Sequence, residues 1–132
     1  MSEERRRVLV VDDEPAIGAS IARVLGDRHE IVALTSGVEA LERVGRDPEA
    51  FDVLLCDLMM PDLDGIRLHQ RIFEIAPELA RSTVFFTGGA FTDAAQQFLA
   101  TTGHPVLEKP VDVEQLVGII DAAARKRNLS QR

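Results

Sequence analysis

The chain has 132 residues and a formal net charge of -7, and 45% of its residues are hydrophobic. This length and composition are typical of one globular domain with its own core and exclude a disordered chain. The acidic balance argues against non-specific nucleic-acid binding, and no apolar run is long enough to span a bilayer. We therefore expect neither nucleic acid nor a membrane as a partner.

The N-terminal residues do not form a signal peptide, because the apolar residues 8–11 run directly into Asp12. The single cysteine, Cys56, has no partner for an internal disulfide, which fits a reducing compartment. We therefore expect a cytoplasmic protein with one domain over residues 1–132. Its core should span about residues 7–124, with short polar tails at both ends.

Five short apolar runs alternate with amphipathic stretches along the chain. They are rich in β-branched residues and nearly continuously apolar, as expected for strands that are covered on both faces. This (βα)5 alternation with short connections predicts an α/β fold: a parallel sheet with right-handed crossovers and helices on both faces. The runs lie near residues 7–12, 30–35, 52–57, 83–87 and 104–108.

The segments between the runs have the spacing of amphipathic helices. The third should be capped by Asp64 and stopped by Pro77, the fourth should open at Thr92 or Asp93, and the last should be capped by Asp112 and end near residue 127. The apolar positions that define the five helical faces are Ile17, Ile21, Leu25, Val38, Leu41, Val44, Ile66, Ile72, Phe73, Ala76, Ala94, Ala95, Phe98, Leu99, Val113, Leu116, Val117, Ile120 and Ala123.

Charged side chains stand where three of the predicted strands end. Asp12 and Asp13 follow the first run, Asp57 ends the third, and Lys109 follows the fifth. The carboxyl ends of parallel strands converge on one crevice, where ligands of such sheets bind. Three carboxylates and an ammonium are therefore predicted to meet, and they suit a hard divalent cation and a phosphoryl group.

Four motifs in this order resemble the receiver domain of two-component response regulators. They are VVDDEP at residues 10–15, DLMMPDLDG at 57–65, FTG at 86–88 and EKP at 108–110. The resemblance covers about residues 7–124 and implies a flavodoxin-like (βα)5 fold with a five-stranded parallel sheet of order 2-1-3-4-5. Residues 87–92 together with 106–110 look like receivers at the ends of hybrid histidine kinases.

The resemblance implies a role for each residue at the strand ends. Asp57 would be the phosphoacceptor, because a carboxylate can attack phosphorus and form a mixed anhydride. Asp13 and Asp57 would bind Mg²⁺ directly, Asp12 would act through water, and Met59 would contribute its backbone carbonyl. The purely structural alternatives are a turn cap for Asp57 and acids that favour a helix N-terminus for the Asp12 pair.

Lys109 and Thr87 complete the site that the resemblance implies. Lys109 would pair with the phosphoryl oxygens, and Thr87 would donate its hydroxyl to them. The peptide bond before Pro110 is often cis in the family. Such a domain catalyses only its own phosphorylation and slow dephosphorylation, so we do not expect an enzyme that acts on a separate metabolite. The purely structural alternatives are an exposed lysine at a strand end for Lys109 and a β-branched residue that ends a strand for Thr87.

The chain departs from the family pattern at three positions. Val106 stands where many receivers have a switch aromatic, and a valine has no ring to swing. Phe91 could substitute for that aromatic or could be a core residue of the next helix. Met59 is apolar and Gly89 has no side chain, at positions where family members often use a polar group to handle the attacking water. We therefore predict that a phosphoryl group on the chain persists.

The leading hypothesis is a receiver that accepts a phosphoryl group from a histidine kinase or a histidine phosphotransfer protein. It would signal by protein–protein contact with a downstream protein through about residues 92–124. A second copy of the chain would be a further partner, in a phosphorylation-dependent homodimer. The alternative is a phosphorylation-independent interaction domain with the same fold. No segment is left over for an output domain, so we expect a single-domain regulator, a relay intermediate or a piece of a longer protein.

The three histidines are scattered and have no metal-ligand spacing.

Overall fold

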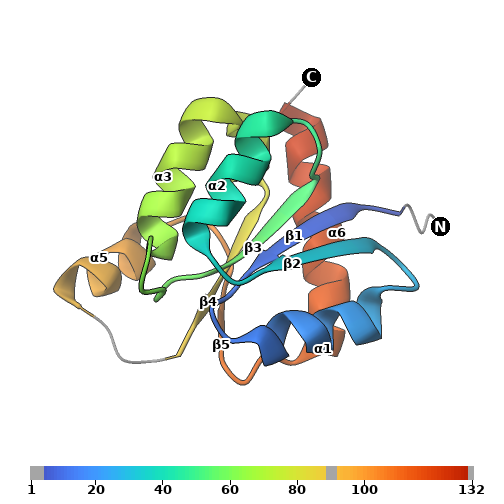
Figure 1. Cartoon of the computed structure of the whole chain (residues 1–132), viewed down its shortest axis with the longest axis horizontal. Helices are drawn as coiled ribbons and strands as arrows, with labels where there is room; N and C mark the ends of the chain where they lie inside the picture. Colours follow the sequence, from blue (N-terminus) through green and yellow to red (C-terminus); the bar gives the residue numbers. More distant parts are fainter. Residues whose placement is uncertain (1–4, 89–91, 131–132) are drawn as a thin grey trace.

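The computed structural model describes residues 5–88 and 92–130 (Figure 1). Within these ranges the chain folds into five strands and six helices, and each strand is followed by one helix, except β3, which is followed by two. They are β1 Arg7–Val11, α1 Pro15–Leu25, β2 Glu30–Leu34, α2 Gly37–Arg46, β3 Val53–Asp57, α3 Gly65–Ile75, α4 Pro77–Arg81, β4 Thr83–Thr87, α5 Asp93–Thr101, β5 Val106–Glu108 and α6 Val113–Ser130.

The five strands form one parallel sheet in the order β2-β1-β3-β4-β5. The register places Val8 of β1 between Ile31 of β2 and Val53 of β3. Every residue of β3 and β4 is buried, which is why these runs are continuously apolar instead of alternating. The predicted α/β fold class and strand order are confirmed.

Alternate residues of the central strands enter two separate cores, one on each face of the sheet. Helices α2, α3, α4 and α5 cover one face, and α1 and α6 cover the other. On the first face the strands contribute Leu9, Val11, Leu54, Cys56 and Phe85, and on the second Val8, Val10, Val53, Leu55, Val84 and Phe86.

Side-chain caps fix where several helices begin. The Asp64 carboxylate accepts a hydrogen bond from the Arg67 backbone N–H at 2.9 Å, which confirms the predicted cap of α3. The cap of α5 is Thr92, whose hydroxyl accepts from the Ala95 N–H at 3.1 Å. These bonds satisfy backbone donors that have no partner within the first helical turn.

The helix count differs from the prediction. Pro77 was expected to stop the third helix, and α3 does end before it, at Ile75. Pro77 also begins the additional short helix α4. A proline suits the first position of a helix, because the N–H that it lacks would have no partner there. The last helix reaches Ser130, three residues beyond the predicted end.

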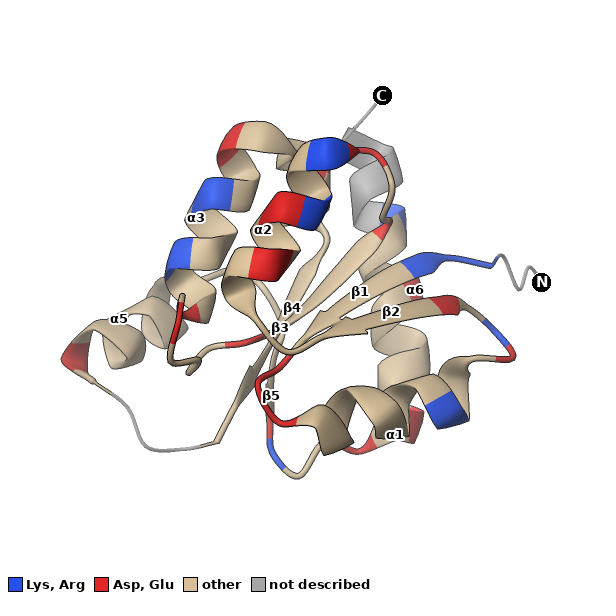
Figure 2. Cartoon of the chain, in the orientation of Figure 1, with Lys and Arg blue, Asp and Glu red and all other residues tan. Residues whose placement is uncertain are grey.

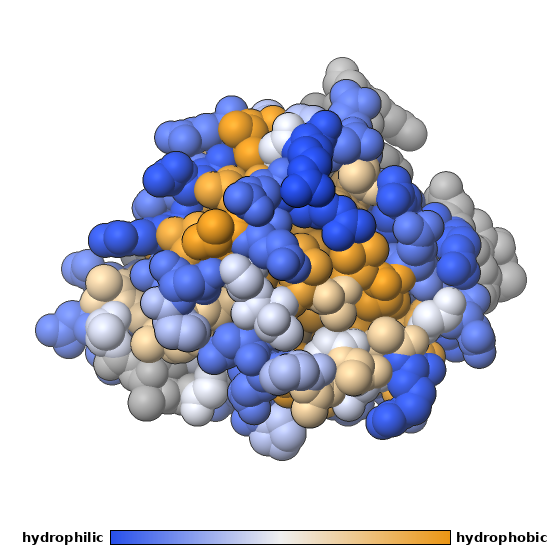
Figure 3. Space-filling model, viewed as in Figure 1, coloured by the Kyte–Doolittle hydropathy of each residue, from blue (hydrophilic) through white to orange (hydrophobic). Residues whose placement is uncertain are grey.

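Two residues that were expected on core-facing helix stripes lie at the surface. Phe73 of α3 is 51% exposed and Val38 of α2 is 47% exposed. The guanidinium of Arg81 lies over the Phe73 ring at 6.0 Å, and Arg81 is itself paired with Glu78. Figure 3 shows hydrophobic residues among hydrophilic ones on the face that carries α2 and α3.

Within the described residues, no helix is long and apolar enough to cross a membrane.

The fold brings together two of the three histidines that are scattered in the sequence. The rings of His69 on α3 and His104 before β5 lie 4.8 Å apart, and both contact Phe85 edge to face. The His69 Nε2 donates to the Ala80 carbonyl oxygen at 2.9 Å. Burial lowers the pKa of His69, which keeps the ring neutral. The pair therefore belongs to the packing between α3 and the end of the sheet.

Candidate functional site

The predicted site residues lie together at the carboxyl edge of the sheet. Asp12 follows β1, Asp57 and Thr87 are the last residues of β3 and β4, and Lys109 follows β5. The sheet hydrogen bonds continue one residue beyond the strands: the Asp12 N–H donates to the Leu34 carbonyl at 3.1 Å, and the Lys109 N–H donates to the Thr87 carbonyl at 2.9 Å. The backbone that carries the site is thus fixed by the sheet.

Three carboxylates form the centre of the site. One oxygen each of Asp12, Asp13 and Asp57 can be chosen so that all three lie within 4.8 Å of one another. Asp12 and Asp57 are each 2% exposed, whereas Asp13 faces solvent. Figure 2 shows the acidic segments after β1 and at the end of β3 beside each other. Clustered carboxylate oxygens with one open side are the donor set that Mg²⁺ prefers, so these residues fit that ion.

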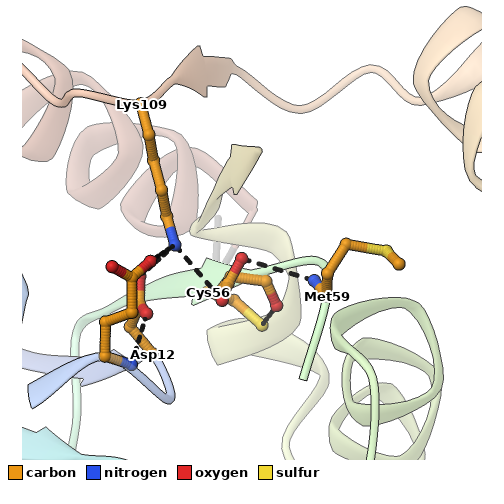
Figure 4. Close-up of polar contacts among 6 residues, drawn as sticks. Asp12, Cys56, Met59 and Lys109 are labelled. Carbon is orange, nitrogen blue, oxygen red and sulfur yellow. Dashed lines mark hydrogen bonds and ion pairs between the residues drawn. The ribbon is translucent and has the colours of Figure 1, made fainter. Parts of the chain in front are cut away.

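Lys109 is shared among three carboxylates (Figure 4). Its Nζ lies 2.9 Å from Asp12 Oδ2, 3.0 Å from Glu14 Oε1 and 3.4 Å from Asp57 Oδ2. The contacts with Asp12 and Asp57 agree with the expected convergence of strand ends. The contact with Glu14 was not predicted, because no local pattern links two residues that are 95 positions apart.

The surroundings raise the pKa values of both Asp57 and Lys109, for different reasons. Burial raises the pKa of Asp57 above its ordinary value, and the charge of Asp12 raises it further, while Lys109 acts the other way. Burial alone would lower the pKa of Lys109, but its hydrogen bonds to Asp12 and Glu14 outweigh that effect and raise the pKa. The carboxylates repel one another, so added positive charge is favourable here.

Met59 borders the site in the loop between β3 and α3. Its backbone N–H donates to Asp57 Oδ1 at 3.3 Å, and its side chain is 43% exposed. It lines an open cavity of about 450 Å³ together with Asp13, Glu14, Asp57, Gly88 and Lys109. The Asp57 carboxylate is therefore reached from solvent through an opening that is lined by carboxylates, a lysine and an apolar side chain.

Two contacts hold the loop that carries Met59. At Gly65 a side chain would collide with the Asp57 carbonyl oxygen and lie only 2.8 Å from the Leu58 Cα, so only glycine lets α3 begin this close to β3. Within the loop, the Asp62 carboxylate accepts hydrogen bonds from the Ser36 hydroxyl at 2.7 Å and from the Val38 backbone N–H at 3.1 Å. The Ser36 hydrogen bond is the main cause that lowers the pKa of Asp62, to about 2.

A comparison with known protein families identifies the chain. The model of the response regulator receiver domain matches residues 8–121. The chain belongs to the response regulator receiver family. Receiver domains are signalling domains, generally without enzymatic activity on other substrates, that interact with histidine kinases or phosphotransfer proteins and bind Mg²⁺ at an acidic pocket.

The relatives of this receiver domain include stand-alone regulators and segments of large kinases. The response regulator receiver protein CpdR of Brucella abortus (strain 2308) is 31% identical over 117 residues, which are 88% of this chain and 94% of CpdR. The signal transduction histidine-protein kinase BarA of Escherichia coli (strain K12) is 32% identical over 114 residues, which are 86% of this chain but 12% of BarA. The chain thus spans a small part of several curated relatives that it matches.

Solved structures agree with this assignment. A response regulator receiver domain protein from Clostridium thermocellum superimposes with a TM-score of 0.81 at 28% sequence identity, over 94% of this chain and 98% of that one. A receiver domain protein described as CheY-like, from Methanospirillum hungatei JF-1, gives a TM-score of 0.81 at 23% identity, which supports the fold alone.

The remaining positions of interest are placed as follows. The Lys109–Pro110 peptide bond is cis, as is often found in the family. Thr87 is 2% exposed and ends β4, the strand that pairs with the strand of Asp57. Val106, at the position of the usual switch aromatic, is half-buried against the core that contains Phe85. The expectations for Gly89 and Phe91 fall outside the described residues.

Proposed function

We propose that Asp57 of this receiver domain accepts a phosphoryl group from a phosphohistidine of a histidine kinase or a phosphotransfer protein. The observation that carries this proposal is the convergence of Asp12, Asp13, Asp57 and Lys109 at the carboxyl edge of the sheet. A nearly buried carboxylate with an open approach, next to two further carboxylates and one ammonium, suits phosphoryl transfer better than any turn-capping role.

In the transfer step, one Asp57 oxygen attacks the phosphorus in line with the bond to the donor histidine. The new O–P bond forms as the N–P bond breaks, and the imidazole nitrogen keeps the electron pair and takes up a proton. Oδ1 of Asp57 is oriented by the Met59 N–H and Oδ2 faces the Lys109 ammonium. Transfer of this kind depends on positioning and charge neutralisation more than on covalent machinery.

The acidic cluster needs positive charge before a phosphoryl group can approach. We infer that Asp12, Asp13, Asp57 and the backbone carbonyl of Met59 hold Mg²⁺. When bound, this ion supplies the charge that offsets the phosphoryl oxygens. Lys109 contributes the second positive charge, since its Nζ already lies 3.4 Å from Asp57 Oδ2.

The residues around the cluster bear on what happens after transfer. We propose that Thr87 donates its hydroxyl to a phosphoryl oxygen, from the strand end next to Asp57. Met59 lines the opening to Asp57 with a side chain that has no hydrogen-bond donor and only a weak acceptor, so it is poorly suited to orient a water. The aspartyl phosphate should therefore be lost slowly, as the sequence analysis predicts.

We propose that the signal leaves through about residues 92–124, which form α5, β5 and α6. β5 is the edge strand of the described sheet, and it packs with α5 on one face and with α6 on the other. A downstream protein, or a second phosphorylated copy, would have to bind one state of this surface better than the other. We place the protein in the cytoplasm, where histidine kinases present their phosphohistidine.

A second candidate function is phosphorylation-independent interaction through the same fold. The specific observation in its favour is Val106, which is packed against the core and has no ring to move between two positions. In that case the acidic site would be a remnant, and binding of partners would not depend on Asp57.

Intact mass after incubation with acetyl phosphate tests the phosphoacceptor directly. We expect one phosphoryl adduct in the presence of Mg²⁺, none after chelation, and loss of the adduct with hydroxylamine, which cleaves acyl phosphates. Asp57→Asn should abolish the adduct. Asp47→Asn is the matched control, because Asp47 is exposed and follows α2 at the opposite edge of the sheet. A folded wild-type chain without any adduct would support the phosphorylation-independent alternative.

A further inference from the structure

Glu14 takes part in the site although none of the roles above uses it. Its Oε1 lies 3.0 Å from the Lys109 Nζ, closer than Asp57 Oδ2 at 3.4 Å. Its side chain is 62% exposed, whereas that of Lys109 is 15% exposed. Glu14 therefore reaches from the rim of the site to the Lys109 ammonium. Without Glu14, that ammonium would face the carboxylates of Asp12 and Asp57.

The position of Glu14 is set by its neighbours in the first turn after β1. The Glu14 backbone N–H donates to Asp12 Oδ1 at 2.9 Å, and Glu14 itself precedes the first residue of α1, Pro15. Its carboxylate lines the same open cavity as Asp57. Any phosphodonor that reaches Asp57 through this opening consequently passes a negative charge at the rim.

Four carboxylates then face one ammonium around the opening: those of Asp12, Asp13, Glu14 and Asp57 against Lys109. Glu14 weakens the attraction for a negatively charged donor in two ways. It adds repulsion at the entrance, and it engages one of the three N–H donors of Lys109, the group that would bind phosphoryl oxygens.

We propose that Glu14 is a specificity-determining residue that selects against small, highly charged phosphodonors in favour of a protein donor. A free dianion has only the site itself to bind, so the repulsion acts on its whole binding energy. A protein donor makes additional contacts over its own surface, which offset the same repulsion. This inference rests on the proposed function, since it concerns which donor phosphorylates Asp57.

The test compares two small donors of different charge on wild type, Glu14→Gln and a control. With acetyl phosphate, Asp57 oxygen forms a bond to phosphorus while the anhydride P–O bond breaks and acetate leaves with the electron pair. Phosphoramidate carries a smaller net negative charge than acetyl phosphate near neutral pH. With this donor the P–N bond breaks and ammonia leaves with the electron pair. Glu42→Gln is the matched control, because it removes the same charge from an exposed position on α2.

The rate constant for adduct formation is measured by intact mass at saturating Mg²⁺ and at low and high salt. For Glu14→Gln we expect the second-order rate constant with acetyl phosphate to rise about three- to tenfold at low salt, with a smaller rise for phosphoramidate. The difference should shrink near 1 M salt, where the screening length falls to about 3 Å. Glu42→Gln should behave as wild type.

The outcomes separate this inference from the proposed function. If wild type is phosphorylated on Asp57 but Glu14→Gln gains nothing, the selection by Glu14 is wrong and the phosphoacceptor assignment stands. An equal gain with both donors that does not respond to salt also overturns it, since a charge filter must depend on charge. If no variant forms an adduct with either donor, the proposed function fails and this inference fails with it.

Discussion

Gly65 offers a direct test of how the site is held, because one added methyl group should disturb both stability and phosphorylation. In Gly65→Ala the new Cβ would collide with the Asp57 carbonyl oxygen and lie 2.8 Å from the Leu58 Cα. Ordinary contacts between carbon atoms are about 3.5–4.0 Å. Since the obstacles are backbone atoms, α3 has to move away from β3 by about 1 Å, or the end of β3 has to move instead.

The expected cost follows from overpacking in a rigid environment. Inserting a methyl group into a packed interior costs about 1–3 kcal/mol, and backbone obstacles favour the upper end of that range. Displacement of Asp57 should also slow the proposed phosphorylation, because a misplacement of about 1 Å can cost up to about 100-fold in rate. We expect Gly65→Ala to lose at least about tenfold in the rate of adduct formation.

Urea denaturation followed by far-UV circular dichroism gives the free energy of unfolding, since the chain has no Trp or Tyr for fluorescence. With a urea dependence of about 1–3 kcal/mol/M, the midpoint should fall by roughly 1 M. Gly118→Ala is the control, because Gly118 lies within α6 and an added Cβ meets nothing within 4 Å. That variant should gain about 0.5–1 kcal/mol from helix propensity.

The result that would refute this reasoning is a Gly65→Ala chain with an unchanged urea midpoint and an unchanged phosphorylation rate. The close approach of α3 to β3 would then not constrain the site. Loss of stability with normal phosphorylation would mean that α3 moves alone and leaves Asp57 in place.

Three further predictions follow from the site and its surroundings. Without Mg²⁺ at pH 8, Asp57→Asn should be more stable than wild type by at least about 1 kcal/mol, because the raised pKa of Asp57 means that folding disfavours its ionised form. Thermal denaturation should show the gain shrinking as the pH falls and the wild-type carboxyl takes up a proton. His29 Nδ1 accepts from the Arg6 N–H at 3.0 Å, and burial lowers the pKa of His29. The contribution of His29 to stability is therefore complete above about pH 6.5 and is lost as the pH falls toward the lowered pKa. Urea midpoints at pH 7.5 and 5.5 should differ more in wild type than in His29→Gln. Equal differences in the two chains would contradict this. Met59→Asn should shorten the half-life of the aspartyl phosphate severalfold, measured by loss of the adduct mass in Mg²⁺, whereas a rapid loss already in wild type would show that the apolar rim does not protect it.

The sequence by itself determined the fold class and the centre of the site. Continuously apolar runs of about five residues that are rich in β-branched residues favour buried strands, and their alternation with helical stretches favours a parallel sheet. Once the sheet is parallel, all strands end at the same edge, and the strand order that the receiver resemblance implies brings Asp12, Asp57 and Lys109 close together there. This geometry is a property of the chain order and needs no knowledge of individual side-chain contacts.

Only the tertiary structure decided which side chains beyond that centre take part. The pairing of Glu14 with Lys109 depends on the rotamers of two long side chains, and nothing near either residue in the sequence specifies it. The Asp62 contacts with Ser36 and the ring contact of His69 with His104 likewise join separate elements.

The exposure of Phe73 and the short helix α4 also escaped prediction, for a related reason. A helical stripe fixes which residues share a face, but the packing of α3 against its neighbours decides how far that face extends. A five-residue helix such as α4 is too short to have a periodic signal of its own. Local patterns thus determine the backbone framework, whereas contacts between distant side chains become defined only when that framework is packed.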